Sequence, residues 1–259
     1  MPLHLRNQPS LVAYLTCGDP DLRTSRDVAL AAIEAGAEVI ELGVPFSDPV
    51  ADGPVIQRAS ERALRDGVSL EQVLKLAQEI RTQSDAGLIV FSYLNPILHM
   101  GLQNFVEAAS VAGVDGALIT DLPVEEAGDY LKLMRKRNLA TVFLAAPTST
   151  DGRLKRIAEA STGFVYAISR TGITGARKDL TEDAQKLVKR LRKFTALPIA
   201  VGFGIASPEH FAAVGQFADA AVVGSAIVQT IEQNPGKEAQ AVAEWIKQVV
   251  GRRSSAVGP

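Results

Sequence analysis

The sequence has few of the residues that mark several large classes of protein. Its one cysteine, Cys17, excludes an intrachain disulfide. The three histidines, His4, His99 and His210, are far apart and lack ligand spacing, so we expect no metal site. No apolar run reaches the ~18 residues of a membrane span, and the first ten residues have no apolar core of signal-peptide length. These absences favour a cytoplasmic protein.

Excess charge is also missing. The chain of 259 residues carries 27 Lys and Arg against 29 Asp and Glu, a net charge of −2. This near-neutral balance offers no electrostatic support for a nucleic-acid partner, and we expect neither nucleic acid nor membrane binding. Hydrophobic residues make up 47% of the chain, which is enough for a large core.

What the sequence does contain is a repeated alternation of short apolar runs and amphipathic stretches. The apolar runs predict strands at 11–16, 38–44, 87–93, 116–120, 140–145, 163–169, 198–202 and 220–224. The stretches between them predict helices at 24–35, 57–82 (broken near Gly67), 103–112, 125–137, 151–160, 181–194, 207–216 and 236–250. Strands apolar throughout are typical of parallel sheets buried on both faces. The fold expected is therefore an α/β protein, a single (β/α)8 TIM barrel over 1–250, with a disordered tail at 251–259.

The first predicted helix has recognisable ends. Thr24 and Asp27 resemble a capping box, and Gly36 fits the position just past the last turn.

Glu41 interrupts the hydrophobic strand "EVIELGV". Side chains alternate along a barrel strand, so Val39, Glu41 and Gly43 share the interior face, near the strand end where active sites of this fold lie. Burial should raise the pKa of this carboxyl, which suits proton transfer near neutral pH. The alternative is a structural ion pair with an interior Lys or Arg, although no predicted strand supplies one.

The loop that follows, "PFSDPVADGP", adds two carboxylates, Asp48 and Asp52. Both stand in turn-forming sequences, and Pro54 suits the first turn of the next helix. Asp52 could therefore act in chemistry or merely cap that helix.

Two glycine-containing loops follow the seventh and eighth predicted strands. Gly202, Gly204 and Gly224 allow a ligand to approach the backbone, and Ser225 opens a short apolar segment with free amide groups. Barrels often bind phosphate there, although tight turns without a ligand remain an alternative. The loop 169–180, rich in Gly and Thr, is interpreted as a lid, or else as a disordered surface loop.

These residues resemble the alpha subunit of tryptophan synthase. The similarity extends from about Leu11 to residue 250 and rests on "ELGVPFSDPVADGPVIQRA", "YLNP", "TDLPVEE", "APTSTDGRL", "YAISRTGITGAR", "VGFGIASPE" and "VVGSAIV". It implies a retro-aldol cleavage, without a cofactor, of indole-3-glycerol phosphate to indole and glyceraldehyde 3-phosphate.

The resemblance also implies roles for single residues. Glu41 would be the general acid/base, Asp52 would accept a hydrogen bond from the indole N–H, and Tyr166 would lie near Glu41. Thr174 matches the lid residue that reaches Asp52. The phosphate-binding positions match Gly175, Phe203, Gly204, Gly224 and Ser225, and the indole pocket matches Tyr14, Phe91, Leu118 and Ile56.

The family works as an α2β2 complex in which indole passes to a beta subunit that carries pyridoxal phosphate. Asp48 and Pro49, with Asn95 and Pro96 of "YLNP", match the docking face. The resemblance thus implies no cofactor in this chain. The short helix that precedes the first strand in the family is absent or rudimentary here.

Three other functions compete with this one. A stand-alone lyase that releases free indole would have a nearly identical site, although the "SDP" loop favours dependence on a beta subunit. A phosphosugar isomerase would not explain "ADGP", and a non-catalytic binding subunit would not need Glu41, Asp52 and a phosphate site together.

Overall fold

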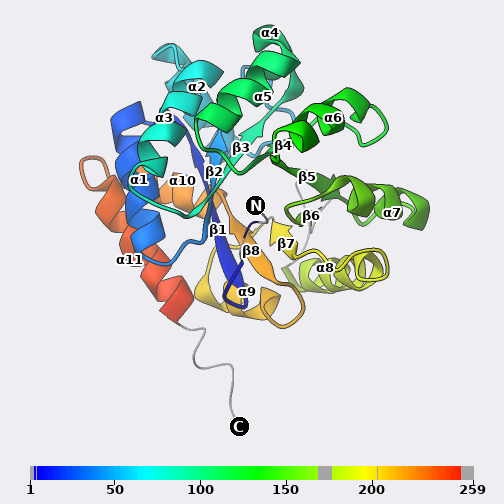
Figure 1. The fold of residues 1–259 in the computed structure, drawn as a ribbon. Coiled ribbons are helices and arrows are strands. Elements are labelled where there is room, and N and C mark those ends of the chain that lie inside the picture. The colour runs from blue at the N-terminus through cyan, green and yellow to red at the C-terminus, as the bar shows by residue number, and fades with distance from the viewer. Residues whose placement is uncertain (1–2, 4, 169–176, 203, 252–259) are drawn as a thin grey trace.

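A closed barrel of eight parallel strands forms the centre of the molecule (Figure 1). The computed structural model describes residues 3, 5–168, 177–202 and 204–251. Each strand pairs with the next and β8 returns to β1, which confirms the predicted (β/α)8 barrel. The strands are β1 Ser10–Thr16, β2 Val39–Gly43, β3 Gly87–Ser92, β4 Gly116–Ile119, β5 Ala140–Ala145, β6 Val165–Ile168, β7 Ile199–Gly202 and β8 Ala220–Val223.

Helices surround the barrel on all sides. They are α1 Leu22–Glu34, α2 Pro54–Arg65, α3 Leu70–Arg81, α4 Leu94–Met100, α5 Leu102–Val111, α6 Gly128–Lys136, α7 Asp151–Ala160, α8 Arg177–Leu191, α9 Pro208–Val214, α10 Ser225–Gln233 and α11 Glu238–Gly251. The break near Gly67 is confirmed, since α2 and α3 are separate. The short helix α4 was not predicted, and α8 includes 177–180 of the predicted lid loop.

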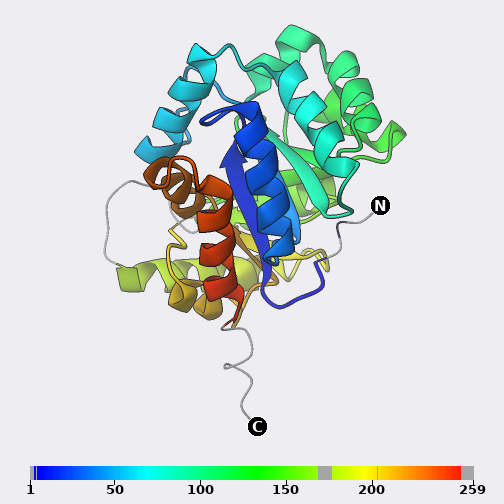
Figure 2. The same cartoon turned by 90° about the vertical axis from the view of Figure 1, so that its left-hand side faces the viewer.

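The ends of α1 differ from the prediction. Asp21 is the N-cap, and its carboxylate accepts a hydrogen bond from Thr24 N at 2.7 Å, so the capping box at Thr24 and Asp27 was wrong. The helix starts one turn earlier, so the Thr24 amide group is one of the free groups that the Asp21 carboxylate satisfies. At the other end of the chain α11 runs through Gly251, one residue into the predicted tail, and packs along α1 (Figure 2). Residues 252–259 lie outside the described part.

The strands bury both faces, as their composition predicts. One set of side chains, including Ile40 and Leu42, packs outward in the large cluster shared with the helices. The other set fills the barrel and includes Val12, Val39 and Leu118. Successive side chains alternate between the two faces of a strand. Since Ile40 and Leu42 of β2 point outward, Glu41 between them points into the barrel.

Leu3 lies at the amino end of the barrel, and no helix precedes β1 among the described residues. Leu3 is 6% exposed and belongs to the interior cluster. A methyl group added at Gly87 or Gly163 would lie 2.7 or 2.9 Å from a Leu3 methyl carbon, so these glycines make room for the leucine. One apolar side chain therefore plugs this end of the barrel interior.

Two further properties concern the described residues as a group. No helix in the described ranges is long and apolar enough to cross a membrane. Within the same ranges, no three His, Cys, Asp or Glu side chains are grouped so that they could hold a metal ion.

Candidate active site

Glu41 lies inside the barrel, near the carboxyl end of β2. Its backbone pairs with Tyr14 on β1 and Ile89 on β3, and its exposed fraction is 0%. Neither carboxylate oxygen has a hydrogen-bond partner within the described residues, so the ion-pair alternative finds no support there. Burial raises the pKa of Glu41 to about 8. The group is therefore mostly protonated at pH 7, without a charge that needs a partner.

Two buried tyrosines flank this carboxyl group, and strand glycines make room for both. A methyl group at Gly43 would lie 2.4 Å from the Tyr14 hydroxyl, and one at Gly202 would lie 2.0 Å from the Tyr166 hydroxyl. Burial, and then the charges of Glu41 and Asp52, hold the pKa of Tyr166 well above its usual value. The tyrosine expected near Glu41 thus lies in the same electrostatic environment as both carboxyl groups.

Asp52 stands in the loop between β2 and α2, and it is not the helix cap. Gly53 is the N-cap of α2, with Pro54 in the first turn as predicted. The Asp52 carboxylate instead accepts a hydrogen bond from the Tyr93 hydroxyl at 3.0 Å. Burial raises the pKa of Asp52 to about 6, and the Tyr93 hydrogen bond opposes this rise.

Tyr93 is a site residue that the sequence analysis missed. Its hydroxyl also accepts a hydrogen bond from Ala51 N at 2.9 Å, and its ring stacks on Phe46 at 4.9 Å. It lies directly after β3, within the "YLNP" motif that was assigned to docking only. The sequence signal that could have identified Tyr93 was its position just past β3, the strand next to β2. Neighbouring parallel strands end at the same rim of the barrel.

These environments separate the two carboxyl groups in their protonation. With pKa values of about 8 and about 6, Glu41 is mainly a proton donor at pH 7 and Asp52 is mainly an anion. Two titratable groups pushed apart in this way are typical of an acid and an electrostatic partner in one site.

The side chains expected to line an indole pocket come from β1, β3 and β4 and from the start of α2. The Phe91 ring meets the Tyr14 ring edge-on at 5.0 Å, and both pack with Ile56 in one cluster. Leu118 is fully buried among the interior residues on β4. An apolar wall therefore lies beside the two carboxyl groups.

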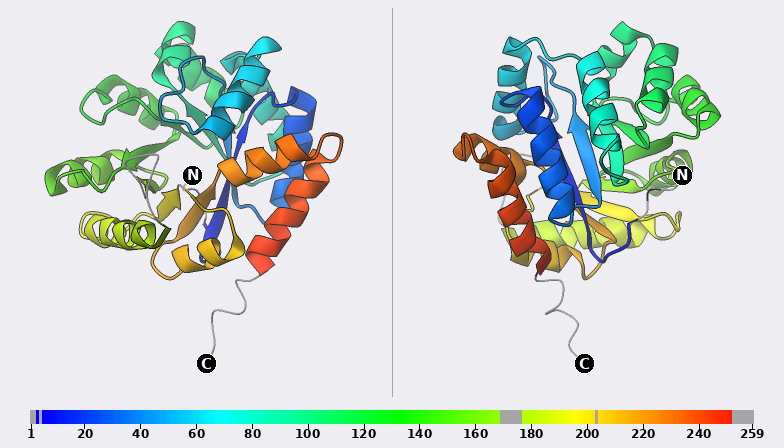
Figure 3. Two further views of the ribbon diagram at one scale, coloured as in Figure 1. Left: turned by 180° about the vertical axis from the view of Figure 1, so that it is seen from behind. Right: turned by 60° about the vertical axis from the view of Figure 1, so that its left-hand side comes forward.

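The glycines expected to bind phosphate lie at the same rim, after β7 and β8, and only β1 separates β8 from β2. β7 and β8 are paired, so the residues after them are neighbours. Gly224 is the N-cap of α10, and Ser225 is its first residue. The left panel of Figure 3 shows α10, in orange, with its start directed to the barrel axis. Gly204 follows β7 with φ of +80°. Free amide groups at such a helix start favour an anion.

Three expected site residues fall outside the described part of the chain. They are Thr174 and Gly175, in the expected lid, and Phe203, after β7.

The residues expected to dock a partner lie in the loop that carries Asp52 and at the start of α4. Asp48 and Asn95 are exposed, and Pro49 and Pro96 are partly exposed. Two large apolar side chains lie among them, Val50 at 87% exposure and Leu98 at 57%.

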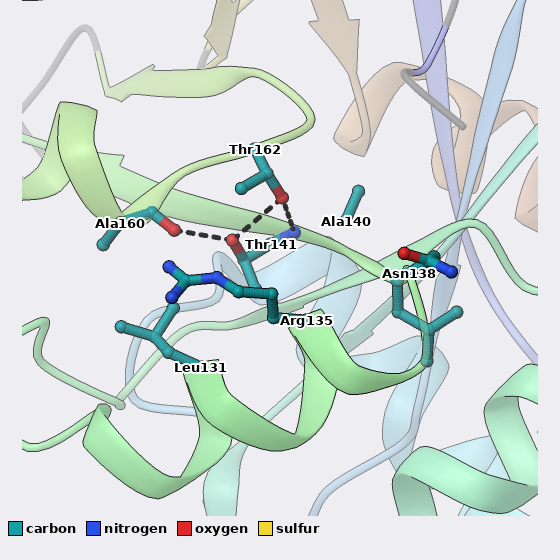
Figure 4. Close-up of a pocket in the computed structure, with 8 residues that line it drawn as sticks. Leu131, Arg135, Asn138, Ala140, Thr141, Ala160 and Thr162 are labelled. Atoms are coloured by element: carbon teal, nitrogen blue, oxygen red, sulfur yellow. Dashed lines mark hydrogen bonds between the residues drawn. The ribbon is translucent and has the colours of Figure 1, made fainter.

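A separate cavity of about 290 Å³ lies at the other end of the barrel, where β5 begins (Figure 4). Its hydroxyl groups are occupied by one another and by the backbone. Thr141 Oγ1 donates to Ala160 O at 2.6 Å, and Thr162 Oγ1 accepts from Thr141 N at 2.9 Å. This cavity has no carboxyl group in its lining, so the candidate site remains at the carboxyl rim.

Comparison with known proteins adds a family to this geometry. A family model for the tryptophan synthase alpha chain matches residues 2–256. The chain is 52% identical to the tryptophan synthase alpha chain of Solibacter usitatus, over 90% of this chain and 87% of that one. It is 44% identical to that of Neisseria meningitidis serogroup B, over 93% and 92%. A chain from a structure of the tryptophan synthase α2β2 complex of Pyrococcus furiosus has a TM-score of 0.89 at 39% identity, over 94% and 98%. The protein therefore belongs to the tryptophan synthase alpha chain family.

Proposed function

We propose that this chain cleaves indole-3-glycerol phosphate to indole and glyceraldehyde 3-phosphate by a retro-aldol step. The observation that carries the proposal is the pair of carboxyl groups at the barrel rim, Glu41 with a pKa of about 8 and Asp52 with a pKa of about 6. The reaction needs a proton donor and a stable negative charge in one site. A phosphosugar isomerase would leave the apolar wall beside them without a use.

Each group has one step in this proposal. Glu41 gives its proton to carbon 3 of the indole, and the resulting carboxylate takes the proton of the side-chain hydroxyl as the carbon–carbon bond breaks. Asp52 accepts a hydrogen bond from the indole N–H and balances the positive charge that develops on the ring. Tyr166 lies near Glu41, in the same electrostatic environment. The added proton stays on carbon 3, since cleavage of the bond between carbon 3 and the side chain restores the aromatic ring and leaves the hydroxyl carbon as the aldehyde.

Binding groups hold the two ends of the substrate apart. Tyr14, Ile56, Phe91 and Leu118 contact the indole. The phosphate is bound by the backbone at Gly204, Gly224 and Ser225, and the proposal extends this role to Phe203 and Gly175, with Thr174 acting on Asp52.

The proposal includes a partner. A tryptophan synthase beta subunit would dock on Asp48, Pro49, Asn95 and Pro96, together with Val50 and Leu98, in an α2β2 complex. Pyridoxal phosphate would belong to that subunit, and this chain would need no cofactor. We also propose that the reaction takes place in the cytoplasm, as the single cysteine suggests. Residues 1–250 would act as one domain, and α11 continues it through Gly251.

Indole release with and without an added beta subunit tests this function. We expect slow cleavage by the chain alone and faster cleavage with beta, because docking against the loop of Asp48 and Pro49 would hold Asp52 in place. A titration of beta with and without indolepropanol phosphate should show tighter binding in its presence. No indole under either condition would refute the activity. Full activity alone, with equal affinities in both titrations, would favour the stand-alone lyase.

A further inference from the structure

A network of four charged side chains lies behind the candidate site. Arg62 donates to both carboxylate oxygens of Asp19, from Nε at 2.7 Å and from Nη2 at 2.9 Å. Its Nη1 donates to Glu232 Oε1 at 2.8 Å. Arg58 holds the same glutamate through Nε at 3.0 Å and Nη2 at 2.8 Å. We call Asp19, Arg58, Arg62 and Glu232 the rim network.

The rim network joins three elements that supply different parts of the site. Arg58 and Arg62 lie on α2, the helix that follows Asp52, and Glu232 lies on α10, the helix that starts at Ser225. Asp19 lies in the loop after β1 and is only 3% exposed. Beneath these charges the two helices pack through small and branched side chains, with Ala59 and Val228 fully buried against Tyr14.

Movement of α2 would be passed directly to Asp52. The Gln57 side-chain amide of α2 donates to the Asp52 carbonyl at 2.8 Å, and Arg58 Nη1 donates to the Pro54 carbonyl at 3.3 Å in the first turn. The start of α10 is likewise tied to the network, because Glu232 is on the same short helix as Ser225. The network therefore sets the separation between the expected indole end and the expected phosphate end of the site.

We propose that the rim network is a positioning device that holds Asp52 and the phosphate site at the distance the substrate spans. This inference rests on the proposed function, since it needs a ligand with an indole at one end and a phosphate at the other. Arg62 is the central member, because its planar guanidinium group donates to two carboxylates on different elements at once. A lysine keeps the charge but cannot make both sets of hydrogen bonds in this geometry.

The test compares ligands that occupy one end of the site with a ligand that occupies both. Calorimetric titrations of wild type and Arg62→Lys would use glycerol 3-phosphate, indole and indolepropanol phosphate. We expect the two small ligands to bind the variant within about twofold of wild type, since each end remains intact. Indolepropanol phosphate should bind the variant about tenfold more weakly than wild type. The kcat/KM for cleavage should fall by a similar factor. For comparison, a misplaced group lowers the rate of a reaction that needs alignment by up to about a hundredfold.

Arg81→Lys is the matched control. Arg81 also holds a partly buried carboxylate, Asp115, at 2.7 Å and three backbone carbonyls, but at the amino end of the barrel. Its exposed fraction, 23%, is close to the 31% of Arg62. We expect this variant to bind all three ligands as wild type does, although both replacements lower the melting temperature.

Four outcomes decide whether the rim network positions the two ends of the site. Loss of affinity for indolepropanol phosphate in Arg62→Lys alone supports the rim network as a positioning device. Equal changes for all ligands, no change, or the same loss in Arg81→Lys would overturn it. Arg58→Lys, at a half-exposed position, gives the same decision if Arg62→Lys does not fold. A wild-type chain that fails to bind indolepropanol phosphate would refute the proposed function instead.

Discussion

Replacing Glu41 by Gln should abolish activity and at the same time stabilise the fold. The pKa of Glu41 is about 8 in the fold, against an ordinary value of 4.5. Between these values the folded protein holds a proton that the unfolded chain releases, so stability is fully present below about pH 4.5 and falls as the pH rises through about 8. Relative to low pH, this titration lowers the free energy of unfolding by about 3 kcal/mol at pH 7. The loss approaches about 5 kcal/mol near pH 9.

Glutamine has the same shape and no such titration. We therefore expect the free energy of unfolding of Glu41→Gln to exceed that of wild type by an amount that grows from about 1 kcal/mol near pH 5 to about 3 kcal/mol near pH 7. A constant offset from burying an amide adds to this difference but does not depend on pH. Cleavage should fall by ~10²–10⁴-fold, the usual contribution of a general acid or base.

Urea unfolding at a series of pH values measures the effect, followed by the fluorescence of the single tryptophan, Trp245. Glu126→Gln, at an exposed position before α6, makes the same chemical change in solvent and should show no such trend. A stability difference for Glu41→Gln that stays flat between about pH 5 and pH 9 would show that the carboxyl group is ionised and satisfied in the fold. The reasoning from its burial would then be wrong, and activity near that of wild type would remove its catalytic role.

The remaining predictions concern the other groups at the rim. The kcat/KM should follow a bell-shaped pH profile with limbs near about 6 and about 8, because Asp52 must be ionised and Glu41 protonated; a profile flat across that range would contradict both assignments. Tyr93→Phe removes a hydrogen bond that lowers the pKa of Asp52, so the acidic limb should move to higher pH, and an unmoved limb would refute the contact. Asp52→Asn should reduce kcat far more than it changes KM, because charge on the indole develops only in the transition state; a change in thermal stability alone would leave Asp52 a structural residue. Ser225→Asp should raise KM strongly by repelling the phosphate, as competition by glycerol phosphate would show, and unchanged affinity would place the phosphate elsewhere.

Hydrophobic patterning alone was enough to predict the barrel. Eight apolar runs between amphipathic stretches leave little choice of architecture, because strands without a polar face must be covered on both sides. Strand β5 and helix α7 begin and end where the pattern placed them. The inward direction of Glu41 also followed from the sequence, since the side-chain period of two is a local property of a strand.

Contacts between distant segments could not be predicted in this way. The partner of Asp52 is Tyr93, 41 residues along the chain, and local sequence allowed the aspartate to be a helix cap equally well. The cap of α1 was misplaced for a similar reason, because Asp21 and Thr24 are both good capping residues and only the backbone geometry chooses between them.

The amino-acid sequence by itself therefore determined the fold, the family signature and the inward face that carries Glu41. Only the tertiary structure decided the environments of these groups. The pKa of Glu41, the Tyr93 hydrogen bond, the plug at Leu3 and the rim network all depend on which side chains from separate elements meet. The physical reason is the distance over which each effect acts. Periodicity and propensity depend on a few neighbouring residues in the sequence. Burial and electrostatic interactions depend on distances in space, which exist only after the barrel has closed.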